Sequence, residues 1–286
     1  SGNSYAGIND TTSLSFTTAD IIAPTVSEVS SSTADGFYRV GDEVFIEIEF
    51  SESVNVVTTN GTPALELETG STKRSATYTS GSGSDTLVFV YTVQAGDSAT
   101  DLNYTTTSAL ALNSGTIKDA AGNDATLTLP TVGGSSSLAG NSALVIDTTD
   151  PTVTGPSSST GTTSKKSINE NNTTVHTFEA NETVTWSLSG GADSSKFSID
   201  SSSGALTFSS APDYESAGDS DSGNDYVVTV RATDSAGNTS DQILTVSIDD
   251  SHELDVSSHQ SGTCYSLEYI CDYDGNFHAN TRSVSD

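Results

Sequence analysis

Alternation with a period of two residues is the feature of this sequence that most restricts its fold. In the segment 43–50, EVFIEIEF, apolar side chains occupy every second position and Glu occupies three of the others. Successive side chains of a β-strand point to opposite faces, so this pattern predicts a strand with one buried and one solvent-facing side. The segments that repeat the pattern are 64–68, 86–93, 225–232 and 242–248.

Short clusters rich in Gly, Ser, Asn and Asp separate these segments, as at 81–85 and 219–224, and such clusters are typical of turns. The apolar residues nowhere form a helical stripe of three turns. Short strands between regular turns predict an all-β fold built from antiparallel β-sandwiches. Hydrophobic residues make up only 33% of the chain, and they suffice for such cores because they are strictly patterned.

The chain contains two imperfect copies of one series of motifs. An Asp-rich joint, DIIAPTV at 20–26, recurs as DTTDPTV at 147–153. The proline in each copy stiffens the entry to the strand that follows. Two tandem units are therefore expected. The further motif pairs, in the same order, are FSESV (50–54) with ANETV (180–184) and DAAGN (119–123) with DSAGN (234–238).

These repeats divide the chain into four expected parts, with sandwiches at 21–150 and 151–250. Residues 1–20 predict a lone strand around Leu14 and Phe16. This strand either ends a preceding domain of a longer repeat protein or inserts into a neighbouring subunit, which would join identical subunits head to tail. Residues 251–286 are too few for a sandwich of their own.

The two units carry a resemblance to known repeats. The first, with FYRVGDEVFIEIEFSESV and the closing IDTTDPTV, resembles the Ig-like repeats of very large bacterial surface proteins. The second, with NEN at 169–171, APDYE at 211–215 and RATD at 231–234, is similar to the cadherin-type repeats of such proteins. The resemblance implies tandem Ig-like and cadherin-like β-sandwiches in an elongated array, display at a bacterial cell surface, and calcium at the joints.

Acidic residues recur in register at the two Asp-rich joints. In a sandwich the joint, the loop after the second strand and the loop before the last strand open at the same end. Ca²⁺ takes six to eight oxygen ligands, and without a cation such acids repel one another. The alternative is solvated side chains in ordinary turns. The predicted ligands are Asp20, Glu52, Asp119 and Asn123 at the first joint, and Asp147, Asp150, Glu182, Asp234 and Asn238 at the second.

The cadherin resemblance implies a further calcium site at the other end of the second unit. Its ligands would be Glu170, Asp213, Glu215, Asp249 and Asp250. The Asp-Ala-Asp element of that family is not evident, and the linker lacks the family's full acidic form. The resemblance therefore leaves the number of ions at this joint open.

Residues 251–286 hold both cysteines of the chain, Cys264 and Cys271, and three of its four histidines. The spacing of the two cysteines matches no common zinc site. In an extracellular protein, a Cys264–Cys271 disulfide that closes a short hairpin is expected instead.

The net charge of −29, from 38 acidic and 9 basic residues, restricts the partners of the chain. Such a charge repels nucleic acids and anionic membrane surfaces. Because no apolar run approaches the length of about 18 residues that spans a bilayer, no membrane insertion is expected.

The sequence carries no nucleophile elbow, no HExxH motif and no phosphate-binding loop. We therefore interpret the chain as a non-enzymatic, calcium-rigidified extracellular spacer or adhesive segment of a surface adhesin or filament. Its expected partners are neighbouring Ig-like domains or identical subunits, with an unknown surface ligand. The alternatives are a carbohydrate- or ligand-binding module and an accessory domain of a secreted polysaccharide-active enzyme.

Overall fold

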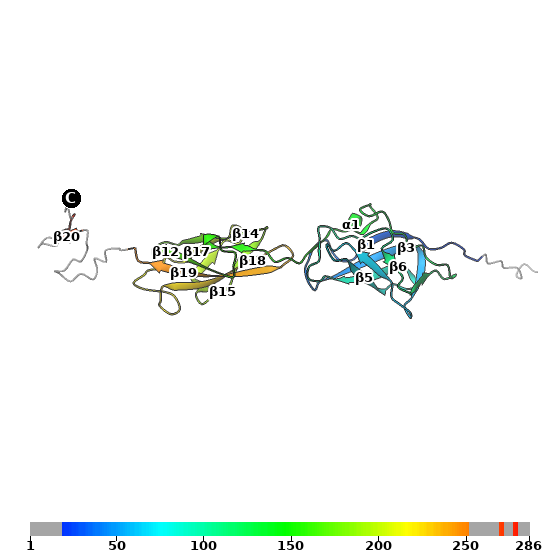
Figure 1. Ribbon diagram of the computed structural model, residues 1–286, viewed down its shortest axis with the longest axis horizontal. Coiled ribbons are helices and arrows are strands. Elements are labelled where there is room, and N and C mark those ends of the chain that lie inside the picture. The colour runs from blue at the N-terminus through cyan, green and yellow to red at the C-terminus, as the bar shows by residue number, and fades with distance from the viewer. Residues whose placement is uncertain (1–18, 252–268, 272–276, 280–286) are drawn as a thin grey trace, which may run out of the picture. The chain divides into compact units, whose positions relative to one another are not determined.

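The computed structural model describes residues 19–251, 269–271 and 277–279 (Figure 1). The chain forms two compact units. Within the described residues, unit 1 comprises the chain up to Thr152 with Ala180–Thr185 and Ala232–Ser240, and unit 2 comprises the remainder. Strands dominate both units, and most of their pairings are antiparallel, which confirms the predicted all-β class.

Unit 1 is built from two sheets. The larger sheet has the order β1 (Val26–Ser31), β3 (Glu43–Val57), β6 (Ser84–Thr92), β5 (Arg74–Ser80), β4 (Ala64–Leu67) and β8 (Leu110–Ala111), with β9 (Thr116–Lys118) paired to β3. The smaller sheet has the order β2 (Gly36–Tyr38), β10 (Leu144–Asp147) and β7 (Ser98–Ala99).

The two sheets of unit 1 share one hydrophobic core. The buried positions of β3 alternate with exposed ones, as the sequence predicts, and Ile46 lies in the same buried cluster as Leu144 and Ile146 of β10. Each such side chain contributes about 1.5–3 kcal/mol when it is removed from water. This burial is the main force that holds the sheets face to face.

Strand β3 extends beyond the predicted segment 43–50. Its register with β6 shifts between Glu49 and Val54, and its last residues then pair with β9, with Asn55 opposite Lys118. Glu52 therefore lies where the strand leaves one partner for another. The switch brings Glu52 close to the loop that follows β9.

The only α-helix among the described residues, α1 (Leu138–Asn141), has four residues. Ser137 caps it, because the Ser137 side chain accepts a hydrogen bond from Gly140 N. In the described part of the chain, no helix is long and apolar enough to cross a membrane.

The remaining sheets lie mainly in unit 2. One sheet has the order β12 (Thr163–Asn169), β19 (Thr239–Asp249), β18 (Asp225–Thr233) and β15 (Thr185–Gly190). A second has the order β13 (Thr174–Thr177), β17 (Ala205–Phe208) and β16 (Phe197–Ile199), and β11 (Val153–Thr154) pairs with β14 (Glu179–Ala180). The short 3₁₀ turns are η1 (Pro156–Ser158) and η2 (Ser194–Lys196).

Aromatic side chains fill the core of unit 2. Phe197 of β16 meets Tyr226 of β18 edge to face, with ring centroids 6.3 Å apart, so the core joins the two sheets. Trp186, the only Trp of the chain, is buried beside Phe178. Strands β12 and β19 pair in parallel, from Thr163 opposite Ile243 to Asn169 opposite Asp249 (Figure 1).

The C-terminal segment contributes a short antiparallel pair, β20 (Tyr269–Cys271) with β21 (Phe277–Ala279). Cys264 lies outside the described residues, so the Cys264–Cys271 disulfide remains a prediction. The predicted strand around Leu14 and Phe16 also lies outside them.

Candidate metal sites

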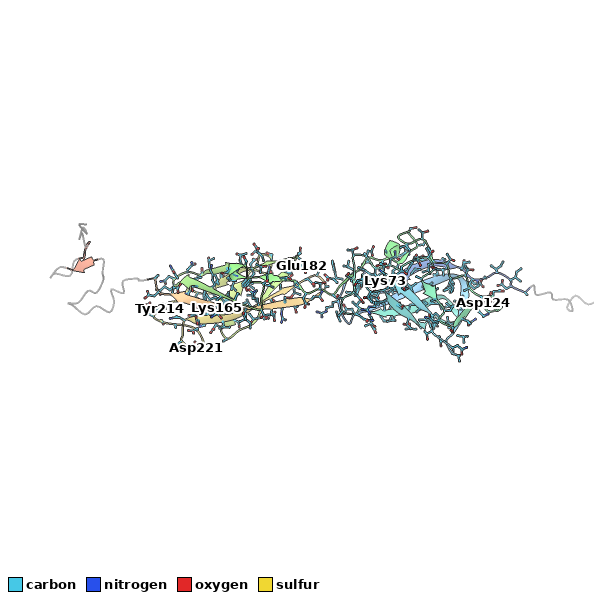
Figure 2. The ribbon with its side chains drawn as sticks, in the orientation of Figure 1. Lys73, Asp124, Lys165, Glu182, Tyr214 and Asp221 are labelled. Carbon is cyan, nitrogen blue, oxygen red and sulfur yellow. The ribbon has the colours of Figure 1, made fainter. Side chains whose placement is uncertain are left out.

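Three groups of carboxylates gather in the described part of the chain. In each group, oxygen atoms from three side chains lie within 4.8 Å of one another. All of these residues are ligands that the sequence predicts. The first cluster is Asp20, Glu52 and Asp119; the second is Asp147, Glu182 and Asp234; the third is Glu170, Asp213 and Glu215. Glu182, in the loop between β14 and β15, is labelled in Figure 2.

In the first cluster, Asp119 is held by its own turn. Its Oδ1 atom accepts hydrogen bonds from Gly122 N at 2.6 Å and Asn123 N at 2.8 Å. Asn123 Nδ2 donates to the Oδ2 atom at 2.6 Å. The turn requires Gly122 at φ +97°, a left-handed conformation that favours glycine. The motif DAAGN therefore fixes both oxygens of a buried carboxylate.

The Asn123 side chain also connects the joint to this cluster. Its Nδ2 atom donates to the carbonyl oxygens of Asp20 at 3.2 Å and of Ile22 at 3.3 Å. The backbone of the joint is thereby held beside the turn that carries Asp119. This contact explains why an aspartate far away in the sequence belongs to the same cluster.

The electrostatics of the first cluster disfavour the charge on Glu52. Burial raises the pKa of Glu52, and the negative charges of Asp20 and Asp119 raise it further. Burial alone would also raise the pKa of Asp119, but hydrogen bonds from Asn123 and Gly122 outweigh it and lower the pKa. Asp119 therefore stays ionised, and its negative charge disfavours the ionisation of Glu52.

The second cluster repeats this arrangement with different residues. Asp234 Oδ1 accepts a hydrogen bond from Asn238 N at 2.8 Å, and its Oδ2 accepts one from Asn238 Nδ2 at 2.9 Å. The same Nδ2 atom donates to the carbonyl oxygen of Asp147 at 3.1 Å. Burial raises the pKa of Glu182, and the charges of Asp147 and Asp234 add to the increase.

The third cluster is organised around the buried side chain of Glu170. Its Oε2 atom accepts a hydrogen bond from Tyr214 N at 2.9 Å, and its Oε1 atom accepts one from Ser251 N at 2.9 Å. These bonds lower the pKa of Glu170. The backbone N–H of Glu215 would lower the pKa of that residue, but burial and the charge of Glu170 outweigh it and raise the pKa.

The other predicted ligands occupy different positions. Asn123 and Asn238 hold the aspartates through their Nδ2 atoms, as described above. Asp150 and Asp249 are exposed and belong to none of the three clusters. Asp250 lies close enough to the third cluster for its charge to raise the pKa of Glu215.

One buried acidic site escaped the sequence analysis. Asp97, which is 0% exposed, accepts hydrogen bonds from Arg74 Nε at 2.8 Å, Tyr91 Oη at 2.7 Å and Gln94 N at 2.9 Å. No sequence signal marks it, because Arg74 and Asp97 come from separate segments. Its hydrogen bonds and ion pair are made within the protein, so we interpret it as a structural site.

The three clusters can bind hard cations. Every donor in them is an oxygen, and no His or Cys belongs to any of the three groups. Calcium and magnesium prefer oxygen ligands, whereas structural zinc is held mainly by Cys and His. A divalent cation at these positions would neutralise the charges that raise the pKa values of Glu52 and Glu182.

No family model matches the chain, and no curated protein matches it. Solved structures that resemble it include cadherin and Ig-like repeats. The third cadherin domain of human protocadherin 7 is 19% identical, with 37% of this chain and 90% of that one covered and a TM-score of 0.29. Drosophila N-cadherin EC1–3 is 16% identical, with coverages of 80% and 68% and a TM-score of 0.29. The tandem Ig repeats of Dlar are 14% identical, with coverages of 79% and 98% and a TM-score of 0.23.

Proposed function

We propose that this chain is a non-enzymatic, extracellular segment of a bacterial surface adhesin or filament, in which bound Ca²⁺ stiffens the joints. The observation that carries the proposal is the repetition of one arrangement in the first and second clusters. In both, a DxxGN turn holds an aspartate, its Asn side chain holds the joint, and a glutamate completes the group. Two separate stretches of sequence thus form the same arrangement of oxygen atoms.

The charge of the clusters supports a cation rather than ordinary turns. Each cluster gathers three carboxyl groups, and the neighbouring charges raise the pKa of one glutamate in each of the first two. Like charges at this spacing destabilise the folded protein when no cation is bound. With only 9 Lys and Arg residues against 38 acids, the chain has few cations of its own to offset them.

The partners in this proposal are neighbouring domains or identical subunits, and a surface or environmental ligand that the chain helps to present. An extracellular location supplies the calcium, because millimolar Ca²⁺ saturates sites that bind with dissociation constants of about 10⁻⁴ to 10⁻³ M. The role of the bound calcium in this proposal is structural. An ion that binds only the folded form shifts the folding equilibrium towards the folded protein.

Thermal unfolding with and without calcium tests the proposal. We expect millimolar Ca²⁺ to raise the melting temperature and a chelator to lower it. A site at a hundredfold excess over its dissociation constant contributes about 2.7 kcal/mol. Glu182→Gln removes one ligand of the second cluster and should reduce the calcium-induced shift, and Glu52→Gln should do the same for the first.

The matched control is Glu43→Gln, which makes the same substitution at an exposed position of β3 outside the clusters. It should leave the calcium-induced shift unchanged. Identical melting temperatures of the wild-type protein with calcium and with chelator would refute the calcium role.

A further inference from the structure

The loop between β17 and β18 contains a pair of aspartates outside the three clusters. Gly223 N donates hydrogen bonds to Asp219 Oδ2 at 2.9 Å and to Asp221 Oδ1 at 3.1 Å. A single N–H group thus faces two carboxyl groups. The hydrogen bond between the two carboxyls raises the pKa of Asp221. Without a cation, this pair must share a proton or bear the repulsion of two adjacent charges.

Two oxygen atoms of this loop are buried and lack a hydrogen-bond donor. Asp219 is 9% exposed, and its Oδ1 atom has no partner. The same holds for Asn224 Oδ1, whose amide is oriented by the hydrogen bond from Nδ2 to Tyr214 O at 2.9 Å. Across the described residues, these are the two buried side-chain polar atoms without a partner. An unpartnered buried acceptor costs about 1–3 kcal/mol, and more when it is charged.

The loop is also anchored by a third aspartate. Asp193 accepts hydrogen bonds from Ser220 N at 2.7 Å and from Val227 N at 2.8 Å, so it holds both sides of the loop. Its charge adds to the increase in the pKa of Asp221. None of the ion pairs between described residues includes Asp193, Asp219 or Asp221. These three aspartates therefore form no salt bridge with a described residue, although Lys196 of η2 lies near Gly218 of the loop.

We propose that the loop Asp219–Asn224 binds a Ca²⁺ ion through Asp219 Oδ1, the carboxylate of Asp221 and Asn224 Oδ1. The two unpartnered oxygens are hard acceptors, the ligand type that calcium prefers, and water completes its six to eight ligands. Asp219 and Asp221 have the spacing of the first two carboxylates in a helix–loop–helix calcium loop. The ligands are disjoint from those of the three clusters, so this site does not depend on the function proposed above.

This site would also act on the third cluster. Asn224 Nδ2 donates a hydrogen bond to the carbonyl oxygen of Tyr214, and the backbone N–H of Tyr214 donates one to Glu170. Figure 2 labels Tyr214 and Asp221 at the same end of unit 2. A cation that fixes Asn224 therefore helps to hold the backbone of Tyr214, whose N–H positions Glu170.

Counting bound calcium ions on the full chain by native mass spectrometry tests this site. A variant with Glu52→Gln, Glu182→Gln and Glu215→Gln weakens the other three clusters and should retain an ion in the loop. Adding Asp221→Asn, at an exposed position, should remove that ion, and adding Asp219→Asn should do the same. The control is Asp101→Asn, at an exposed position outside all four groups, which should not change the count.

The fluorescence of Trp186 in each variant verifies that unit 2 is folded. Equal ion counts with and without Asp221→Asn in a folded protein would overturn the loop site, and the proposed function would stand if Glu182→Gln still lowers the count. Conversely, a wild-type protein whose only bound ion is lost with Asp221→Asn would support the loop site and refute the three-cluster proposal.

Discussion

Replacing Asp97 with Ala should destabilise unit 1 selectively. The carboxylate accepts hydrogen bonds from Arg74, Tyr91 and Gln94 in a position without solvent contact. Its removal leaves the buried hydroxyl of Tyr91 and the N–H of Gln94 without an acceptor. The guanidinium of Arg74 also loses its partner, although the Arg74 side chain is 25% exposed and reaches water.

The expected cost follows from these three contacts. Removing one partner of a buried ion pair costs about 3–5 kcal/mol, and each buried donor left unsatisfied costs about 1–3 kcal/mol. Because water screens Arg74, the ion pair itself contributes less than a fully buried one. We therefore expect Asp97→Ala to lower the free energy of unfolding of unit 1 by about 3–5 kcal/mol. Asp97→Asn, which keeps one acceptor oxygen, should cost less.

Urea titration with two optical probes measures this effect. Trp186 lies in the core of unit 2, so its fluorescence reports on that unit. Tyrosine fluorescence includes the buried Tyr91 and Tyr104 of unit 1 and Tyr226 of unit 2, so the tyrosine transition of unit 1 is the part that does not coincide with the tryptophan transition. Asp97→Ala should move the tyrosine transition to lower urea and leave the tryptophan transition in place. Asp101→Asn, an exposed control, should shift neither by more than about 0.5 kcal/mol. An unchanged tyrosine transition in Asp97→Ala would refute the reasoning.

Two further substitutions in unit 2 test its core by tryptophan fluorescence. Burial lowers the pKa of His176 below its ordinary value of 6.5. The neutral form is therefore favoured on folding, and stability should fall as the pH drops from 7 to 5, because the unfolded state binds the proton first. His176→Gln should reduce this pH dependence, and an unaltered dependence would contradict it. Gly204→Ala places a Cβ atom 2.7 Å from Phe178 O at φ +72°, so it should cost about 1–3 kcal/mol. Gly83→Ala, with φ +90° and open space around it, is the control for backbone strain alone, and because Gly83 lies in unit 1 its cost is measured by tyrosine fluorescence. A Gly204→Ala cost no larger than that of Gly83→Ala would contradict the steric part.

Much of the fold could be predicted, because burial of one face of a sheet produces an alternating pattern of apolar and polar residues in the sequence. The predicted segments 225–232 and 242–248 became β18 and β19 with small extensions. The extension of β3 to Val57 could not be predicted, because it depends on the change of partner from β6 to β9. Pairing partners are set by contacts distant in sequence, which a local pattern does not contain.

The candidate ligands illustrate the same division. Repetition of DxxGN and of the joint sufficed to predict that Asp20, Glu52 and Asp119 would meet. The sequence of the segment 219–224 by itself indicates only a turn. What distinguishes it is the burial of Asp219 Oδ1 and Asn224 Oδ1 and the anchoring by Asp193, and these depend on tertiary packing. Asp97 carries no sequence signal for the same reason, since its partner Arg74 comes from a separate strand.

The parallel pairing of β12 with β19 determines how unit 2 responds to tension. A pull on the two ends of this unit draws these strands in opposite directions along their length, because one leads into the sheet and the other leads out. The ladder from Thr163–Ile243 to Asn169–Asp249 is then loaded in shear, so its hydrogen bonds must break together rather than one after another. Forced unfolding is limited by the rate of this step, and shear geometry makes it slow. A tether built from such units would remain folded under a flow force that is large enough to separate a strand pair whose hydrogen bonds break one after another from one end.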